Sequence, residues 1–217
     1  MGELRGLLSG PVEQLAPRLL GARLMAGGVT VRLTEVEAYA GEGEDPGSHA
    51  HRGRTPRTEV MFGPAGHAYV YLSYGMHWCL NVVVGPEGRA AAVLLRGAEV
   101  VDGLEAARAR RPGSVDRDLC RGPARLTRAL GVTGGPDGCG GLDLLDPGSA
   151  VRLLDLPGRT DATGVPDASG PEGRAALGIT CGPRVGVAGA GAQTPWRFWL
   201  VGDPTVSAYR AAVPRRR

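Results

Sequence analysis

Lysine is missing from the sequence altogether, and all 25 basic residues of the 217-residue chain are arginine. A phosphate-binding Walker A loop requires a lysine, so the glycine-rich run at 134–141 is a loop of another kind. No lysine can form a Schiff base either, which leaves the chain's N-terminal amine as the only candidate amine nucleophile. Because genomic base composition can produce an all-arginine chain, the arginine excess alone does not indicate nucleic-acid binding.

Long apolar runs, paired cysteines and a strong net charge are also lacking. No stretch approaches the eighteen apolar residues of a membrane span, and the first ten residues carry neither a signal-peptide core nor a myristoylation signal. The four cysteines show no CxxC spacing, which favours reduced thiols over a disulfide framework. The formal net charge is only +3, a weak argument for an anionic partner. We therefore expect a cytoplasmic protein without membrane association.

Glycine and proline are abundant, with 36 and 17 residues, which predicts many short elements and long turns. Alternating apolar residues predict strands at 29–40, 68–73, 77–84, 90–96, 151–156, 184–187 and 197–201. Helical spacing occurs at 104–111 and 123–130, and 12–24 predicts a short helix interrupted by a proline. Loops are expected at 41–57, 131–142 and 157–172. The pattern predicts a single α+β domain over 1–217, built around a mostly antiparallel β-sheet with a protruding β-hairpin and flanking helices.

Aromatic residues are scarce, yet four of the five tyrosines lie between Tyr39 and Tyr74. Glu35, Glu37 and Tyr39 alternate along a predicted strand, so their side chains point to one face. A carboxylate beside flat rings suits a general base acting on a stacked planar substrate, with a nucleobase as the leading candidate. The alternative is an edge strand that exposes an acidic face to solvent.

The second tyrosine group lies in the predicted hairpin. If its tip is centred on the glycine at 75, Tyr71 lies opposite Cys79 and Tyr69 lies opposite Asn81, with all four side chains on one face. Tyr74 then falls out of step and lies exposed at the tip. An exposed aromatic ring in this position suits insertion between base pairs, although it also suits a contact with another protein.

The remaining polar candidates are an arginine and the histidines. Arg96 follows an apolar run, and an arginine that is nearly buried needs a carboxylate partner, for which Glu37 is a candidate. An ordinary structural salt bridge is the alternative. No three histidine or cysteine residues have a recognised metal-binding spacing, so we expect no metal site. A polar contact from His49 or His51 to a ligand is the better interpretation.

The candidate residues belong to a series of short motifs that follow one another along the chain. They are Glu35–Tyr39, His49 followed by Thr55–Arg57, Met61–Phe62, Tyr69–Met76, Asn81, Val93–Arg96, Gly122–Leu126, Arg184–Gly186 and Pro195–Phe198. Together they closely resemble the 3-methyladenine (alkyladenine) DNA glycosylase family of base excision repair. The resemblance spans about residues 12–207 and leaves a short basic tail at 215–217.

The resemblance implies roles for the candidate residues. Glu37 looks like the general base that activates water, and Arg96 looks like the residue that holds this water and the carboxylate in place. Tyr39 would stack on one face of an extruded base. Tyr71 and His49 would close the other side.

The same resemblance implies contacts at the pocket floor and on DNA. Asn81 would line the floor and disfavour guanine by crowding its exocyclic amine. Tyr74 looks like the wedge that fills the gap left by the flipped nucleotide, with Met76 and His77 beside it in the minor groove. Which of the three intercalates is left open. Arg125 occupies the position of a basic phosphate contact.

The implied protein is a monofunctional DNA glycosylase, a hydrolase that flips alkylated or deaminated purines from double-stranded DNA and leaves an abasic site. The absence of lysine agrees, because glycosylases that also nick the strand commonly use an amine nucleophile. We expect a monomer without a cofactor, associated with DNA in the cytoplasm. The preferred damaged purine stays open. Two other readings are a purine nucleoside hydrolase and a non-enzymatic binding module for damaged or single-stranded DNA.

Overall fold

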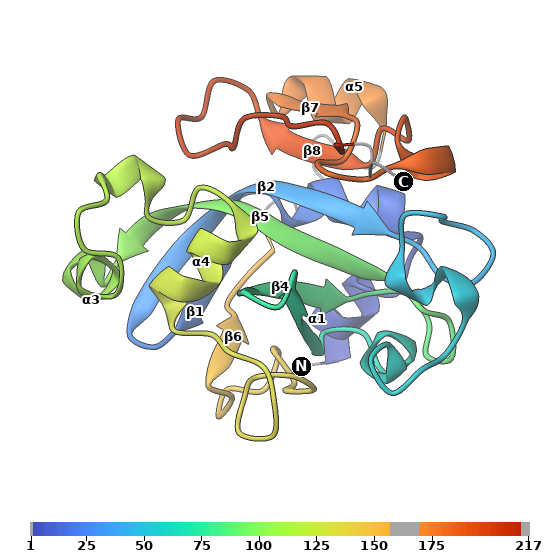
Figure 1. Cartoon of the computed structure of the whole chain (residues 1–217), viewed down its shortest axis with the longest axis horizontal. Coiled ribbons are helices and arrows are strands. Elements are labelled where there is room, and N and C mark those ends of the chain that lie inside the picture. Colours follow the sequence, from blue (N-terminus) through green and yellow to red (C-terminus); the bar gives the residue numbers. More distant parts are fainter. Residues whose placement is uncertain (1, 157–169, 214–217) are drawn as a thin grey trace.

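A computed structural model of the chain describes residues 2–156 and 170–213 and shows a curved sheet with short helices around it (Figure 1). The sheet order is β3-β4-β5-β2-β1-β6, with β8 pairing with β2 and β7 with β8, and every pairing between these strands is antiparallel. The strands are β1 (Arg23–Ala26), β2 (Val29–Tyr39), β3 (Ala68–Ser73), β4 (His77–Val83), β5 (Ala92–Asp102), β6 (Val151–Leu153), β7 (Ile179–Gly182) and β8 (Arg197–Leu200). The predicted α+β class is confirmed.

The helices are short and lie around the sheet (Figure 1). The α-helices are α1 (Gly2–Leu7), α2 (Val12–Leu15), α3 (Leu104–Arg110), α4 (Pro123–Leu130) and α5 (Pro171–Ala176). The single 3₁₀ turns are η1 (Ala16–Leu19), η2 (His49–Arg52), η3 (Glu59–Phe62), η4 (Asp116–Asp118) and η5 (Gly189–Gly191). No helix in the described part of the chain is long and apolar enough to cross a membrane.

A β-bulge in β2 decides which side chains face the candidate site. Register shifts against β5 occur on both sides of Glu35. Before the bulge Val31 and Leu33 point into the hydrophobic core, whereas after it Val36 and Ala38 do. The alternation therefore changes by one residue, and the odd-numbered positions from 35 to 39 leave the core face. Without this shift the acidic residues would be buried among aliphatic side chains.

The acidic segment of β2 lies inside the sheet. Residues Glu35 and Glu37 pair with β5 on one side and with β8 on the other, and both side chains are 0 % exposed. The interpretation as an edge strand with a solvated acidic face is therefore wrong. In Figure 1, α5, β7 and β8 lie together along β2 and provide the second neighbour that the sequence pattern did not reveal.

Helix α4 packs on the hairpin side of the sheet through an apolar face. Leu126, Ala129 and Leu130 are buried, and Thr127 donates its hydroxyl to the carbonyl of Trp78 at 2.9 Å. Burying each of the two leucine side chains contributes about 1.5–3 kcal/mol relative to exposure. This packing fixes the start of α4 close to β4.

Most predicted elements are confirmed within a few residues, but the strand expected at 184–187 is wrong. There Gly186 has φ = 72°, outside the range of a strand, and the amide of Val185 donates to a carboxylate instead of to a neighbouring strand. Helices α1 and α5 and strands β1 and β7 were not predicted, and the helix expected at 12–24 ends before β1 begins at Arg23. Residues 157–169 of the expected loop and the basic tail at 215–217 lie outside the described residues. The domain limits stay a prediction.

Candidate active site

One cavity of about 820 Å³ lies between the hairpin, the loop after β2, the first half of β5, the start of α4 and the segment 185–188. Five residues predicted for catalysis or base binding line it, namely Tyr39, His49, Tyr71, Asn81 and Arg96. Its volume falls in the range that holds a nucleoside-sized ligand. Five of the six residues predicted for catalysis or base binding therefore lie in the wall of this cavity, and only Glu37 does not.

The hairpin supplies one wall in the register expected from the sequence. Tyr71 pairs with Cys79 and Tyr69 with Asn81. The ring of His49 stands nearly perpendicular to that of Tyr71, with centroids 4.7 Å apart and an interplanar angle of 86°. Of the two candidates in the loop after β2, His49 lines the cavity and His51 does not. A role for His49 in base binding stays a prediction.

Hydrogen bonds define the protonation of His49. Its Nε2 lies 3.3 Å from Nη2 of Arg57, and its Nδ1 lies 3.1 Å from the hydroxyl of Tyr69. A guanidinium only donates, so Nε2 accepts and Nδ1 carries the proton. Burial, and then the charge of Arg57, lower the pKa of His49 to about 4. The cavity therefore holds a neutral imidazole at physiological pH.

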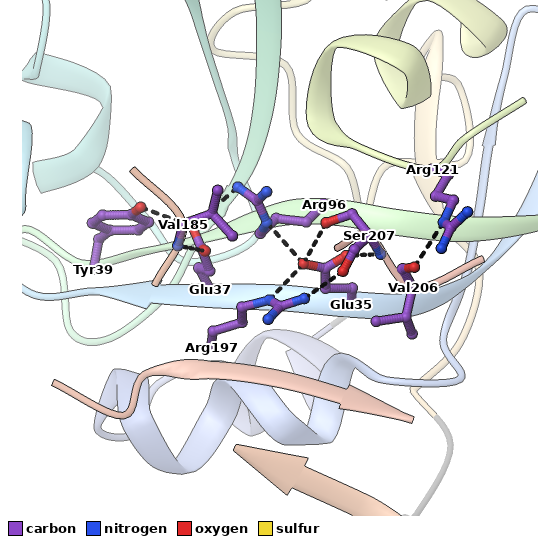
Figure 2. Close-up of polar contacts among 9 residues, drawn as sticks. All are labelled: Glu35, Glu37, Tyr39, Arg96, Arg121, Val185, Arg197, Val206 and Ser207. Atoms are coloured by element: carbon purple, nitrogen blue, oxygen red, sulfur yellow. Dashed lines mark hydrogen bonds and ion pairs between the residues drawn. The ribbon is translucent and has the colours of Figure 1, made fainter. Parts of the chain in front are cut away.

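Three groups contact the buried carboxylate of Glu37 (Figure 2). One oxygen, Oε1, accepts from the backbone amide of Val185 at 2.7 Å, and the other, Oε2, accepts from the Tyr39 hydroxyl at 2.9 Å. Arg96 Nη1 lies 3.4 Å from Oε2. All three partners line the cavity, although the Glu37 side chain itself is 0 % exposed. The carboxylate is therefore separated from the cavity only by the three residues that contact it.

Arg96 is shared between two carboxylates, as Figure 2 shows. Its Nε donates to Oε1 of Glu35 at 3.0 Å, while Nη1 faces Glu37. Burial alone would lower the pKa of Arg96, but Glu37 and Glu35 outweigh burial and raise the pKa above its ordinary value. The expected Arg96–Glu37 contact is confirmed, and Glu35 is a second partner.

Tyr39 is supported from behind by a buried ion pair. The guanidinium carbon of Arg184 lies 4.5 Å from the Tyr39 ring centroid, and Arg184 donates to both oxygens of Asp45, at 2.5 and 2.7 Å. Arg184 and Asp45 are 0 % and 2 % exposed. Burial and the neighbouring Glu37 raise the pKa of Tyr39 well above its ordinary value, so its hydroxyl remains a hydrogen-bond donor.

Asn81 lies at the buried end of the cavity and is 3 % exposed. Its Nδ2 donates to the carbonyl oxygen of Tyr69 at 2.8 Å, and Tyr69 is the residue directly opposite Asn81 in the hairpin. This bond fixes the plane of the amide. A rigid polar group at this depth can discriminate between ligands by their exocyclic substituents.

The hairpin tip is exposed and carries the predicted DNA contacts. Tyr74 has φ = 51° and is 82 % exposed, and Met76 is 69 % exposed. Tyr74 and His77 lie at the cavity boundary, whereas Met76 does not line it. Arg125 lies outside the cavity on the first turn of α4, beside Pro123 and Ala124, which do line it. These positions place the predicted DNA contacts on or beside one rim.

The sequence interpretation assigned no catalytic part to Val185, Arg184 or Asp45. Val185 acts through its backbone amide, which no residue type reveals. Arg184 and Asp45 lie 139 positions apart in the chain, and only the fold brings them together. Within the described ranges, no three histidine, cysteine, aspartate or glutamate residues form a group that could hold a metal ion.

Comparison with known proteins agrees with the geometry. The model of a family described as methylpurine-DNA glycosylase matches residues 7–204. A protein of Frankia casuarinae is 52% identical over 206 residues, covering 95% of this chain and 91% of the relative. A protein of Streptomyces avermitilis is 49% identical over 219 residues (98% and 94%), and one of Nocardia farcinica is 52% identical over 200 residues (90% and 85%). All three carry the name "Putative 3-methyladenine DNA glycosylase".

Proposed function

This chain belongs to the methylpurine-DNA glycosylase family, and we propose that it uses Glu37 to release alkylated or deaminated purines from duplex DNA. Membership makes it a DNA glycosylase, a hydrolase of N-glycosyl bonds that takes part in the repair of damaged DNA. The roles of individual residues are our proposal. They rest on the geometry of the cavity and of the polar groups behind it.

The observation that carries the proposal is the arrangement of donors around Glu37. An ionised carboxylate has about four acceptor positions, and three are used by Val185, Tyr39 and Arg96. Oε1 accepts one of these bonds, so one of its acceptor positions has no partner among the described residues. A water molecule bound there would be activated by Glu37 and held beside the cavity, as hydrolysis of a glycosidic bond requires.

The aromatic walls suit a flat, electron-poor base. A purine inside a duplex is out of reach, so its nucleotide must leave the stack at a cost of a few kcal/mol. Tyr39 would cover one face of the extruded base, and Tyr71 with His49 would cover the other. A purine alkylated at N3 or N7 is cationic and gains about 0.5–2 kcal/mol from contact with an aromatic face. Asn81 at the buried end would crowd the exocyclic amine of normal guanine.

The chemistry proceeds through a sugar that resembles an oxocarbenium ion. An alkylated purine is a good leaving group, so its glycosidic bond needs little acid assistance. The negative charge of Glu37 stabilises the developing positive charge on the sugar and also takes the proton of the attacking water. Arg96 keeps Glu37 in place. Since the chain contains no lysine, the usual amine route to strand cleavage is closed and an intact abasic site would remain.

The exposed tip would keep the nucleotide out of the helix. Tyr74 is a rigid ring at the end of a tight turn, and its insertion into the emptied position would offset part of the flipping cost. Met76 and His77 lie next to it on the hairpin and would follow the minor groove. Arg125, which is half-exposed on α4, would bind a phosphate.

The proposal is tested by base release from duplex oligonucleotides that carry 7-methylguanine or hypoxanthine. We expect wild type to release the base and to leave sites that break only after alkali. Glu37→Gln keeps the size of the side chain and should lower the rate at least about 100-fold while lesion binding persists. Glu99→Gln, which changes a half-exposed carboxylate on β5, is the matched control and should retain the wild-type rate.

Other results would replace the proposal. Hydrolysis of free purine nucleosides without activity on duplex DNA would indicate a nucleoside hydrolase. Binding of the damaged duplex without base release by wild type would indicate a binding module. Equal rates for wild type and Glu37→Gln would remove Glu37 from the catalytic role.

A further inference from the structure

Glu35 is a buried carboxylate that accepts four hydrogen bonds beside the cavity, although it does not line it (Figure 2). Its Oε1 accepts from Arg96 Nε at 3.0 Å, from Arg197 Nε at 2.7 Å and from Ser207 Oγ at 2.9 Å. Its Oε2 accepts from the backbone amide of Ser207 at 2.7 Å. Every one of these groups is fixed, and Glu35 itself is 0 % exposed.

The contact with Glu35 determines how Arg96 meets Glu37. A guanidinium offers its donors in a rigid planar fork, so anchoring one nitrogen fixes the direction of the others. Nε of Arg96 is anchored on Glu35 at 3.0 Å, and only Nη1 reaches Glu37, at the longer distance of 3.4 Å. Arg96 therefore cannot turn to form a bidentate pair with Glu37. Such a pair would occupy the acceptor position that a water molecule needs.

We propose that Glu35 is a positioning residue of the glycosylase reaction, which anchors Arg96 and balances the charge around Glu37 without touching the substrate. This inference rests on the proposed function of Glu37. It adds a second carboxylate and the segment that carries Ser207 to the groups that control the chemical step.

The charge balance supports this role. The buried cluster contains two carboxylates, Glu35 and Glu37, and two guanidinium groups, Arg96 and Arg197, so its net charge is zero. Removal of the Glu35 charge would leave the cluster with one excess positive charge next to a sugar that becomes positive in the transition state. A unit charge acting across about 6–12 Å at an effective dielectric constant of about 20 changes a rate roughly 10- to 100-fold.

The segment after β8 completes the anchor. Arg197 Nη2 donates to the carbonyl of Ser207 at 2.7 Å, and Arg121 Nε donates to the carbonyl of Val206 at 2.8 Å. Opposite Glu35 on β5 lies Gly97, where a Cβ atom would lie 3.0 Å from the Glu35 Cβ and 3.1 Å from the carbonyl of Thr205. The absence of a side chain at Gly97 thus lets this segment approach Glu35.

The decisive experiment measures single-turnover base release, with enzyme in excess, from a hypoxanthine duplex between about pH 4.5 and 8. Glu35→Gln keeps the shape of the side chain and removes its charge. We expect the rate on the plateau to fall roughly 10- to 100-fold, with lesion binding changed less than about threefold. The acid limb of the profile should move to lower pH, because the loss of a negative charge beside the cavity makes protonation there less favourable.

Controls separate positioning from folding. Glu99→Gln removes a carboxylate from the exposed end of β5 and should leave both the plateau and the acid limb unchanged. If Glu35→Gln does not fold, Ser207→Ala takes its place. This variant removes one hydrogen bond from Glu35 but keeps the backbone bond, and it should slow base release about 3- to 10-fold. A merely structural role would lower only the folded fraction and would not move the acid limb.

Each outcome has one meaning. The positioning role is overturned if folded Glu35→Gln keeps the wild-type acid limb and plateau. If Glu35→Gln does not fold, a wild-type rate in Ser207→Ala overturns it. Either result leaves Glu37 as the base. Inactivity of both wild type and Glu99→Gln on the hypoxanthine duplex and on the 7-methylguanine duplex overturns the proposed function, and the positioning role with it. Loss of lesion binding in Glu35→Gln would assign Glu35 to the shape of the cavity instead of to the chemical step.

Discussion

The central guanidinium carbon of Arg184 lies 4.5 Å from the ring centroid of Tyr39, and Tyr39 itself lines the cavity. Arg184 also lies 5.4 Å from the ring centroid of Trp196 and donates to the carbonyl of Ala38 at 2.8 Å. One face of Tyr39 is therefore permanently covered by a cation that is paired with Asp45. A ring held in this way cannot rotate without losing its contact with Arg184 and its hydrogen bond to Glu37.

The first prediction concerns this ion pair. Asp45→Asn leaves the charge of Arg184 buried and unpaired, and should lower the free energy of unfolding by about 3–5 kcal/mol. Denaturant unfolding measures the change. Glu44→Gln, which disrupts an exposed pair with Arg89, should change the free energy of unfolding by less than about 1 kcal/mol. A similar loss in both variants would contradict the structural role of the Arg184–Asp45 pair.

The second prediction concerns the hairpin tip. Tyr74→Asn should leave the free energy of unfolding within about 0.5 kcal/mol of wild type, because Tyr74 is 82 % exposed and asparagine tolerates its positive φ. Base release from hypoxanthine paired in a duplex should fall at least about tenfold, since no ring fills the emptied position.

A comparison of substrates checks the reason for this loss. Hypoxanthine in a single strand needs no wedge, so wild type and Tyr74→Asn should release it at similar rates. Val201→Ala, at a valine that is 64 % exposed beyond β8, should behave as wild type on both substrates. An equal loss on single-stranded and duplex DNA would show that Tyr74 acts on the cavity and not on the duplex.

Local patterns predicted the hairpin because its geometry is local. Alternation and a turn at position 75 are sufficient to pair Tyr71 with Cys79, and the structure has this register. The acidic face of β2 was also predicted, but its burial was not. That burial depends on β8, which reaches β2 from more than 150 positions further along the chain. A pattern within a short stretch of sequence cannot indicate a strand pairing over this separation.

The unpredicted groups of the site share a physical cause. Val185 contributes a backbone amide, which every non-proline residue possesses, and its turn was mistaken for a strand because valine favours strands. Glu35 was placed on the correct face, but its partner Ser207 lies 172 positions away. Single side chains with chemical character can be recognised in a sequence, whereas the donors that orient them require the fold.

The third prediction concerns pH. Burial and Arg57 lower the pKa of His49 to about 4 from the ordinary 6.5, so the unfolded chain binds a proton at a higher pH than the folded protein does. The contribution of His49 to stability is complete above about pH 6.5 and is lost progressively as the pH falls from there towards 4. His49→Gln should therefore show a shallower decline of the unfolding free energy across this window.

Proton NMR of the imidazole checks the cause directly. Arg57→Ala removes a nearby positive charge, and should raise the pKa of His49 while keeping it below 6.5, because burial remains the larger cause. Arg54→Ala, at an exposed arginine that pairs with Glu59, is the matched control and should leave the titration of His49 unchanged. A titration near 6.5 in wild type would contradict the buried, neutral imidazole.

The fourth prediction concerns the narrow space between β5 and the segment after β8. Gly97→Ala would place a methyl group 3.0 Å from the Cβ of Glu35 and 3.1 Å from the carbonyl of Thr205, closer than ordinary contact distance. Relief requires a shift of Glu35 or of the segment, at a cost of about 1–3 kcal/mol in stability. Since Glu35 anchors Arg96, base release should slow together with the loss of stability. Gly140→Ala, where no atom lies within 4 Å of the added Cβ, is the control and should change neither the stability nor the rate. A folded Gly97→Ala protein with the wild-type rate would show that the contact between Glu35 and Arg96 tolerates displacement.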